Sequence, residues 1–250
     1  MKNGRFVINT LVCLDEIKDG ATQLQLLKPL SELDVHAVEV RREFIRDENE
    51  FEKMKREGES LGVDLFYSVP DGLFDNGEIN MAHVQRYFME AEKLGAKMVK
   101  FNLGDFRGFS VQDMKALNKV LGSDPMVVTV ENDQTVVNGT VNNLLPFLIE
   151  CEQKGIPIHT TFDIGNWYWV GEDPINNVEK LAPYIKYIHL KDVQMIENRP
   201  QTVRLGKGVV PWHNILSLLS YNIPVALEYP CGRYPYEVVK NEISLLSQFQ

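Results

Sequence analysis

The sequence predicts a single (β/α)8 TIM barrel, and three observations support that fold class. Short β-branched runs alternate with longer amphipathic stretches throughout the 250 residues. Strict alternation of strands and helices is typical of parallel strands joined by helical crossovers. Eight such units in a chain of this length fit a closed barrel better than an open sheet. No linker or low-complexity tract divides the chain, so we expect one domain over residues 1–250.

The eight expected strands are short runs rich in valine, isoleucine and aromatic residues. In chain order they cover residues 5–9, 36–40, 63–69, 97–103, 126–131, 158–163, 185–190 and 225–229. Residues 81–96 and 140–155 carry apolar side chains at steps of three and four, which predicts helices. Gly155 and Pro157 stand where the second of these helices should end.

Composition and charge exclude several classes of function. The chain is 44% hydrophobic and 24% charged, and its net charge is -9. That charge argues against broad contact with nucleic acid or an anionic membrane. No apolar run is long enough for a signal peptide or a membrane span. Cys13, Cys151 and Cys231 lack any CxxC spacing, so we expect reduced thiols in a cytoplasmic protein.

Four polar residues stand at the ends of the last four expected strands. They are Glu131 in MVVTVEN, Asp163 in IHTTFDIGN, His189 in IKYIHLKD and Glu228 in IPVALEYP. A buried carboxylate or imidazole is costly unless something compensates its desolvation. In a barrel, the carboxyl ends of all strands share one mouth, where active sites are built. Three carboxylates and one imidazole suit one divalent ion, so we predict a site for Mn²⁺, Mg²⁺, Co²⁺ or Zn²⁺.

The positions around these four residues are consistent with that site. Stepping back two residues along each strand reaches Thr129, Thr161, Tyr187 and Ala226, which would form an inner layer beneath a polar rim. The longest loops, 166–174 and 193–210, would lie over the same mouth. The alternative is that each residue only caps a loop or helix, which explains one such residue better than four in the same relative place.

With these motifs, the chain resembles the xylose-isomerase-like TIM barrel superfamily. The quartet looks like that superfamily's metal ligands, and VTVEN, FDIGN, HLKD and LGKGVVPW (205–212) are similar to its segments. The superfamily includes sugar-phosphate isomerases and epimerases, ketose 3-epimerases, hydroxypyruvate isomerases, inosose dehydratases and the AP-endonuclease family 2 nucleases. The resemblance covers essentially the whole chain and specifies the superfamily rather than the substrate.

The resemblance implies a metal-dependent isomerase or epimerase of a sugar or sugar phosphate. The sugar's carbonyl and neighbouring hydroxyl would bind the ion, which acidifies the C–H between them. Glu131 and Glu228 would be the catalytic pair, one removing the proton to form an enediolate and the other returning it. Loss of a β-hydroxyl after the same step would instead make the protein a dehydratase. A non-catalytic carbohydrate-binding barrel is a further alternative, although a complete quartet speaks against it.

Six further residues are expected to contact the substrate. Lys100 would stabilise an enediolate, carboxylate or phosphate, or else pair with an acid such as Glu39. Glu39 ends the second expected strand, and Trp167 offers an aromatic face to a sugar. The full set is Lys100, Asn102, Glu39, Asn166, Trp167 and Arg204.

Two positions depart from the pattern of the family's epimerases, and the histidine count separates the chain from the nuclease branch. Family epimerases often carry a histidine where this chain has Asn166 and an arginine where it has Met195. Arg204 or Arg199 could reach in from the same loop. The nucleases need several more histidines at strand ends than His189, so we expect no nucleic-acid substrate. Relatives often form homodimers, although no apolar stripe in this sequence demonstrates one.

Overall fold

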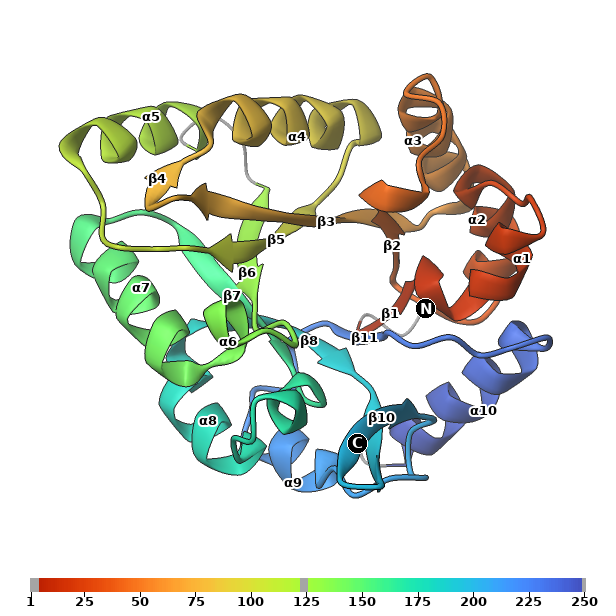
Figure 1. Ribbon diagram of the computed structural model, residues 1–250. Helices are drawn as coiled ribbons and strands as arrows, with labels where there is room; N and C mark the ends of the chain where they lie inside the picture. The colour runs from red at the N-terminus through yellow and green to blue at the C-terminus, as the bar shows by residue number, and fades with distance from the viewer. Residues whose placement is uncertain (1–4, 122–125, 249–250) are drawn as a thin grey trace.

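The computed structural model describes residues 5–121 and 126–248, which form the predicted closed barrel of eight parallel strands (Figure 1). Strand β1 pairs with both β2 and β11, and this pairing closes the ring. The barrel strands are β1 (Phe6–Asn9), β2 (Ala37–Arg41), β3 (Asp64–Asp75), β5 (Met98–Gly104), β6 (Val127–Glu131), β7 (Ile158–Asp163), β8 (Ile185–Leu190) and β11 (Val225–Leu227).

Helices surround the ring of strands, and Figure 1 shows them on its outer side. They are α1 (Leu14–Lys18), α2 (Gln23–Ser31), α3 (Glu50–Leu61), α4 (Met81–Leu94), α5 (Val111–Leu121), α6 (Val136–Gly139), α7 (Val141–Lys154), α8 (Pro174–Leu181), α9 (Trp212–Ser217) and α10 (Pro235–Ser247). Short 3-10 helices cover Thr10–Cys13, Arg42–Phe44, Asn166–Trp169 and Ala182–Tyr184. Within the described residues, no helix is both long and apolar enough to cross a membrane.

The two helices predicted in detail form as expected and end for the same reason. Helix α4 is followed by Gly95 and helix α7 by Gly155, each with a φ of 67°. This left-handed conformation is costly for residues with a Cβ atom, so glycine terminates the helix. Pro157 then prevents its continuation.

Two hairpins extend beyond the predicted elements. Strand β3 runs past its expected end at residue 69 to Asp75 and turns back into β4 (Glu78–Ile79). Part of the segment expected as a loop over residues 193–210 forms an antiparallel hairpin of β9 (Asp192–Ile196) and β10 (Arg199–Val203). Its turn residues, Glu197 and Asn198, have φ values of 50° and 60°. Two consecutive positive φ angles suit the right-handed twist of a two-residue hairpin, a local effect that hydrophobic periodicity does not reveal.

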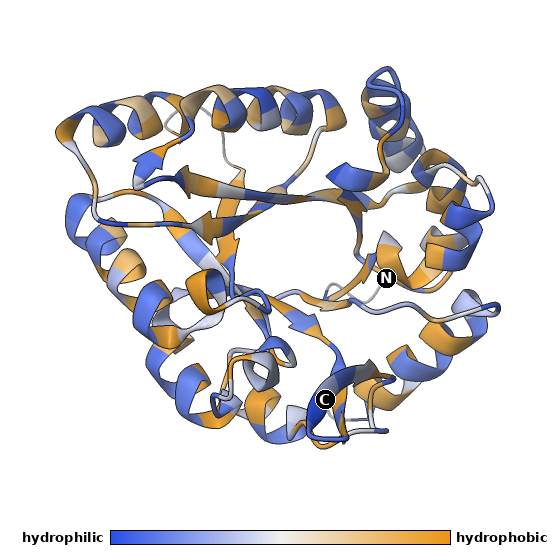
Figure 2. Cartoon of the chain, in the orientation of Figure 1, coloured by the Kyte–Doolittle hydropathy of each residue, from blue (hydrophilic) through white to orange (hydrophobic). Residues whose placement is uncertain are grey.

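The barrel interior changes from apolar to polar along the strands. Its lower part is a cluster of Val7, Ala37, Phe66, Met98, Tyr187 and Ala226. Above it, Thr129 and Thr161 share a hydrogen bond of 2.7 Å between their hydroxyl groups. A larger apolar core packs the strands against the surrounding helices, whose mixed orange and blue colouring in Figure 2 reflects their amphipathic sequences. The polar end of this interior is therefore held by a rigid scaffold.

Candidate metal centre

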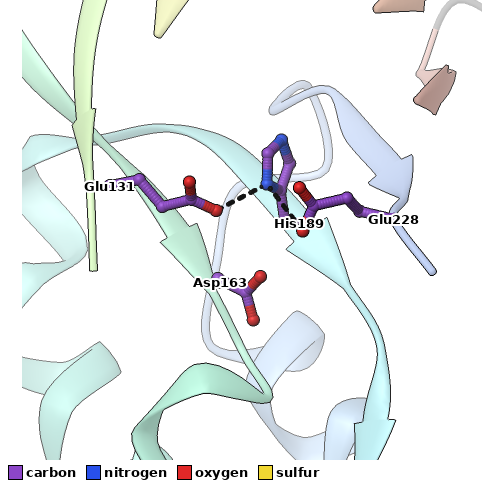
Figure 3. Close-up of side chains that lie close together, drawn as sticks. All are labelled: Glu131, Asp163, His189 and Glu228. Atoms are coloured by element: carbon purple, nitrogen blue, oxygen red, sulfur yellow. Dashed lines mark hydrogen bonds and ion pairs between the residues drawn. The ribbon is translucent and has the colours of Figure 1, made fainter. Parts of the chain in front are cut away.

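The four predicted ligands meet at the carboxyl-terminal end of the barrel (Figure 3). One ligand atom from each of Glu131, Asp163, His189 and Glu228 can be chosen so that all four lie within 4.8 Å of one another. The four side chains are buried. They come from β6, β7, β8 and the residue after β11, which are neighbours around the barrel. Parallel pairing brings these strand ends together although they are far apart in sequence.

Asp163 is positioned by hydrogen bonds from its surroundings. Its Oδ1 accepts from the backbone N–H groups of Gly165 at 2.9 Å and Asn166 at 3.0 Å. The Asn132 side chain accepts from the Asp163 N–H at 2.8 Å and donates to the Asp163 carbonyl at 2.9 Å. These contacts hold Oδ1 on the loop that follows β7 and leave the other oxygen, Oδ2, in contact with Lys191.

His189 is held between carboxylates on both sides of its ring. Its Nδ1 lies 2.8 Å from Oε1 of Glu131 and 3.4 Å from Oε2 of Glu228. Its Nε2 lies 3.0 Å from Oε2 of Glu39. Glu39 in turn accepts hydrogen bonds from the Asn9 amide at 2.7 Å and the Tyr187 hydroxyl at 3.0 Å. Nδ1 is therefore the nitrogen that faces the other ligands, and Glu39 supports the ring from behind.

Each catalytic glutamate candidate also contacts a cation. The ammonium of Lys100 lies 2.6 Å from Oε2 of Glu131. The guanidinium of Arg41 donates to Oε1 of Glu228 at 2.6 Å. In both residues, one carboxylate oxygen faces His189 and the other is paired with a positive charge. Such pairing compensates part of the cost of burying these carboxylates.

Burial and charge shift the pKa values in the cluster in different directions. Burial opposes ionisation of Glu131, but Lys100 and His189 outweigh it and lower its pKa to about 2. The pKa of Glu228 is also lowered, because a neighbouring lysine and His189 outweigh its desolvation. Burial raises the pKa of Asp163 to about 7 despite a nearby lysine. Burial disfavours protonation of His189, but the surrounding carboxylates raise its pKa well above 6.5.

The donor set fits one divalent cation. Three carboxylates and one imidazole nitrogen are ligands that such ions accept, and they converge on one point. The carboxylate of Asp163 is fully buried, and backbone N–H groups hold its Oδ1. Its Oδ2 forms an ion pair of 2.7 Å with Nζ of Lys191.

The other residues singled out in the sequence lie in different surroundings. Asn102, partly exposed, donates a hydrogen bond of 2.7 Å to the Pro70 carbonyl. Asn166 is buried and donates to the Asn132 carbonyl at 2.8 Å. Trp167 is fully buried, and its ring packs 5.3 Å from that of Phe162.

The arginines considered for the loop after β8 lie toward solvent. Arg204 is exposed. Burial raises the pKa of Glu242 on α10, and the charge of Arg204 partly offsets that increase. Met195 and Arg199 lie on the β9–β10 hairpin, and Met195 is 47% exposed. A substrate contact by any of these residues stays a prediction.

Two residues of the site were not assigned a role from the sequence. Lys191 contacts both Asp163 and Glu228, and Arg41 contacts Glu228. A signal was available for both. Lys191 stands two residues after His189 and Arg41 two residues after Glu39, so each shares the inward side of its strand with a residue already selected.

The HLKD and LGKG motifs are connected through Asp192. Its carboxylate accepts from the N–H groups of Val193 at 2.8 Å, Gly208 at 2.9 Å and Val210 at 2.9 Å. A Cβ atom at position 208 would lie 2.2 Å from the Val193 carbonyl oxygen, so only glycine fits there. The aspartate thus connects the loop after the hairpin to the end of β8, close in sequence to His189.

Comparisons with known proteins agree with this architecture. The model of the xylose isomerase-like TIM barrel family matches residues 27–249. No curated protein sequence matches the chain significantly. Among solved structures, the chain is similar to the probable 3-DHS dehydratase AsbF of Bacillus anthracis, which is described as involved in petrobactin synthesis. The TM-score is 0.73 at 17% identity, and the match covers 97% of this chain and 98% of that one.

Further solved structures share the fold at similarly low identity. A D-tagatose 3-epimerase-like protein has a TM-score of 0.73 and 15% identity, with 98% of this chain and 96% of that chain covered. A xylose isomerase domain protein of Planctomyces limnophilus has a TM-score of 0.70 and 18% identity, with 99% and 96% covered. The match of the family model over most of the chain shows that this protein belongs to the xylose isomerase-like TIM barrel family.

Proposed function

We propose that this protein is a divalent-metal-dependent isomerase or epimerase that acts on a sugar or sugar phosphate. The observation that carries the proposal is the convergence of Glu131, Asp163, His189 and Glu228 within 4.8 Å at the barrel mouth. Family membership and epimerase neighbours support the class of reaction. When bound, the cation would polarise the substrate's carbonyl and make the adjacent C–H more acidic.

Glu131 and Glu228 are the proposed acid–base pair. They approach Nδ1 of His189 from β6 and from the end of β11, so a substrate carbon between them would meet one carboxylate on each side. The lowered pKa of both keeps them ionised at neutral pH, the state that a proton acceptor needs. One would take the proton and could return it to the adjacent carbon. Delivery to the opposite face would come from the other glutamate after that group has gained a proton from solvent.

Among the proposed substrate contacts, Lys100 has the strongest support. Its ammonium lies beside Glu131 inside the barrel, where it would stabilise negative charge on a substrate oxygen. Asn102 lies farther along the same strand and is partly exposed. Glu39, Asn166, Trp167 and Arg204 have weaker support, because the first three are buried among scaffold partners and the last is exposed.

A second candidate function is a dehydratase of the same substrate class. It is favoured by the similarity to a probable 3-DHS dehydratase over nearly the whole length of both chains. The same proton abstraction followed by loss of a β-hydroxyl would give this outcome, so the two functions share Glu131, Glu228 and the cation.

Incubation in D₂O with Mn²⁺ and a panel of ketoses, ketose phosphates and keto-inositols tests both. Deuterium at the epimeric or adjacent carbon would indicate epimerisation or isomerisation, and a new conjugated chromophore would indicate dehydration. Glu131→Gln should abolish either reaction, whereas Glu52→Gln on the exposed side of α3 should not. Turnover that survives metal removal or Glu131→Gln would refute the proposal. Sugar binding without exchange would point to a non-catalytic carbohydrate-binding barrel.

A further inference from the structure

Two buried lysines lie among the carboxylates of the metal centre. Nζ of Lys191 is 2.7 Å from Oδ2 of Asp163 and 2.9 Å from Oε2 of Glu228. Nζ of Lys100 is 2.6 Å from Oε2 of Glu131. Lys100 is 3% exposed and Lys191 is 6% exposed. Every carboxylate of the proposed ligand set is therefore in contact with an ammonium group.

These contacts reduce the electrostatic cost of burying three carboxylates side by side in the metal-free protein. Three carboxylates that lie this close together repel one another, and each loses its hydration on burial. A bound divalent cation would relieve both effects. Without it, Arg41 and His189 contact the two glutamates, and the lysines contact all three carboxylates, with Lys191 bridging two of them as a cation would.

The neighbouring backbone leaves space for the stem of Lys191. A Cβ atom on Gly165 would lie 2.4 Å from Cγ and 3.1 Å from Cδ of Lys191. Gly165 has a φ of -89°, which any residue adopts without strain. Glycine at this position is therefore explained by the lysine beside it rather than by backbone conformation.

We propose that Lys100 and Lys191 are built-in counter-ions that hold Glu131, Asp163 and Glu228 in place in the metal-free protein and compete with the divalent cation for them. This inference rests on the metal site of the proposed function. The lysines keep the site assembled before the cation arrives. Their positive charge also weakens cation binding relative to the carboxylates alone, so the ion exchanges more readily.

Mn²⁺ titration by isothermal calorimetry at pH 8 tests the competition directly. Lys191→Met and Lys100→Met remove a charge while keeping a long apolar stem. Each should lower the Kd for Mn²⁺ about tenfold or more, since a unit charge within a few ångströms of a buried ion is worth at least this much. Lys191→Arg keeps the charge and should stay close to the wild type. Lys115→Met on the exposed side of α5 is the matched control and should leave the Kd unchanged.

Thermal unfolding provides a second readout that a purely structural role would not reproduce. The metal-free methionine variants should unfold at a lower temperature than the wild type, because each variant removes one ammonium contact from the buried carboxylates. Saturating Mn²⁺ should restore most of that loss, so the metal-induced rise in Tm becomes larger than in the wild type. A structural role alone would lower Tm equally with and without Mn²⁺.

The outcomes separate this inference from the proposed function. If the wild type binds no divalent cation, the metal site itself is wrong. If the wild type binds Mn²⁺ but both methionine variants bind it equally well or more weakly, only the counter-ion role is overturned. Should one variant fail to fold, the other decides, because the two lysines act on different carboxylates.

Discussion

Oε2 of Glu39 lies 3.0 Å from Nε2 of His189, on the side of the imidazole opposite to Glu131 and Glu228. The acid is fully buried, and Asn9 and Tyr187 hold it in place through hydrogen bonds. This arrangement orients the ring and directs Nδ1 toward the remaining ligands. A carboxylate behind a ligating histidine also makes the imidazole a better donor to a cation.

Glu39→Gln should therefore weaken divalent-cation binding without removing a ligand. The expected loss in affinity for Mn²⁺ is about 10- to 100-fold, the range found when such supporting carboxylates are replaced. Calorimetric titration of the purified variant measures it, with Glu52→Gln on the exposed side of α3 as control. Unchanged affinity would mean that Glu39 does not support His189 and would leave it available for the substrate.

Cation affinity should increase with pH. Burial raises the pKa of Asp163 to about 7, and the surrounding carboxylates raise that of His189 against its desolvation. Both groups must lose a proton before they bind a cation. Affinity should therefore rise with pH, and the rise should be steeper below pH 7, where Asp163 still carries a proton, than above it. Titrations from pH 5.5 to 8.5 measure this dependence, and an affinity that does not change with pH would contradict the raised pKa values of Asp163 and His189.

The stability of the metal-free protein should change with pH in the opposite direction. Asp163 has a higher pKa in the folded chain, about 7, than its ordinary value of 3.8. Its contribution to the free energy of unfolding is complete below pH 3.8 and is lost as the pH rises through 7. Asp163→Asn should lessen the decline in Tm between pH 5 and 7. If the Tm of the variant declines equally, the pH dependence arises from groups other than Asp163.

Asp192→Ala should loosen the segment between β10 and α9. Three backbone N–H groups would lose their acceptor, two of them on buried residues, Val193 and Val210. A buried donor left without a partner costs about 1–3 kcal/mol, so a loss of roughly 2–6 kcal/mol in the free energy of unfolding is expected. Hydrogen exchange should accelerate at Gly208 and Val210. Exchange that stays slow there would show that other contacts hold the loop.

Phe147→Ala should destabilise the fold while leaving the metal centre intact. The ring is fully buried on α7 and packs against Phe74, Phe106 and Phe109 outside the barrel. Truncation of a buried phenylalanine costs about 3–5 kcal/mol. Urea denaturation measures this loss. The Kd for Mn²⁺ of the folded variant should match the wild type, and a large change would reveal coupling between this cluster and the site.

The barrel could be predicted from the sequence because its strands and helices follow local patterns, and the four candidate ligands were selected from the same patterns. Hydrophobic periodicity, helix-ending glycines such as Gly155, and polar residues at strand ends are visible in windows of a few residues. Parallel pairing then requires those strand ends to meet, so Glu131, Asp163, His189 and Glu228 could be joined without coordinates. The closed ring of eight strands agrees with the eight strand–helix units counted in the sequence.

The side chains that surround these four residues depend on long-range packing and could not be predicted from the sequence. Arg41 reaches Glu228 across 187 residues, and Tyr187 reaches Glu39 across 148. Lys191 was visible in HLKD, but its contact with two carboxylates depends on the space beside Gly165. Trp167 follows Asp163 closely in sequence, yet the 3-10 turn directs its ring into the core. Such contacts depend on strand register and loop path, which local patterns do not encode.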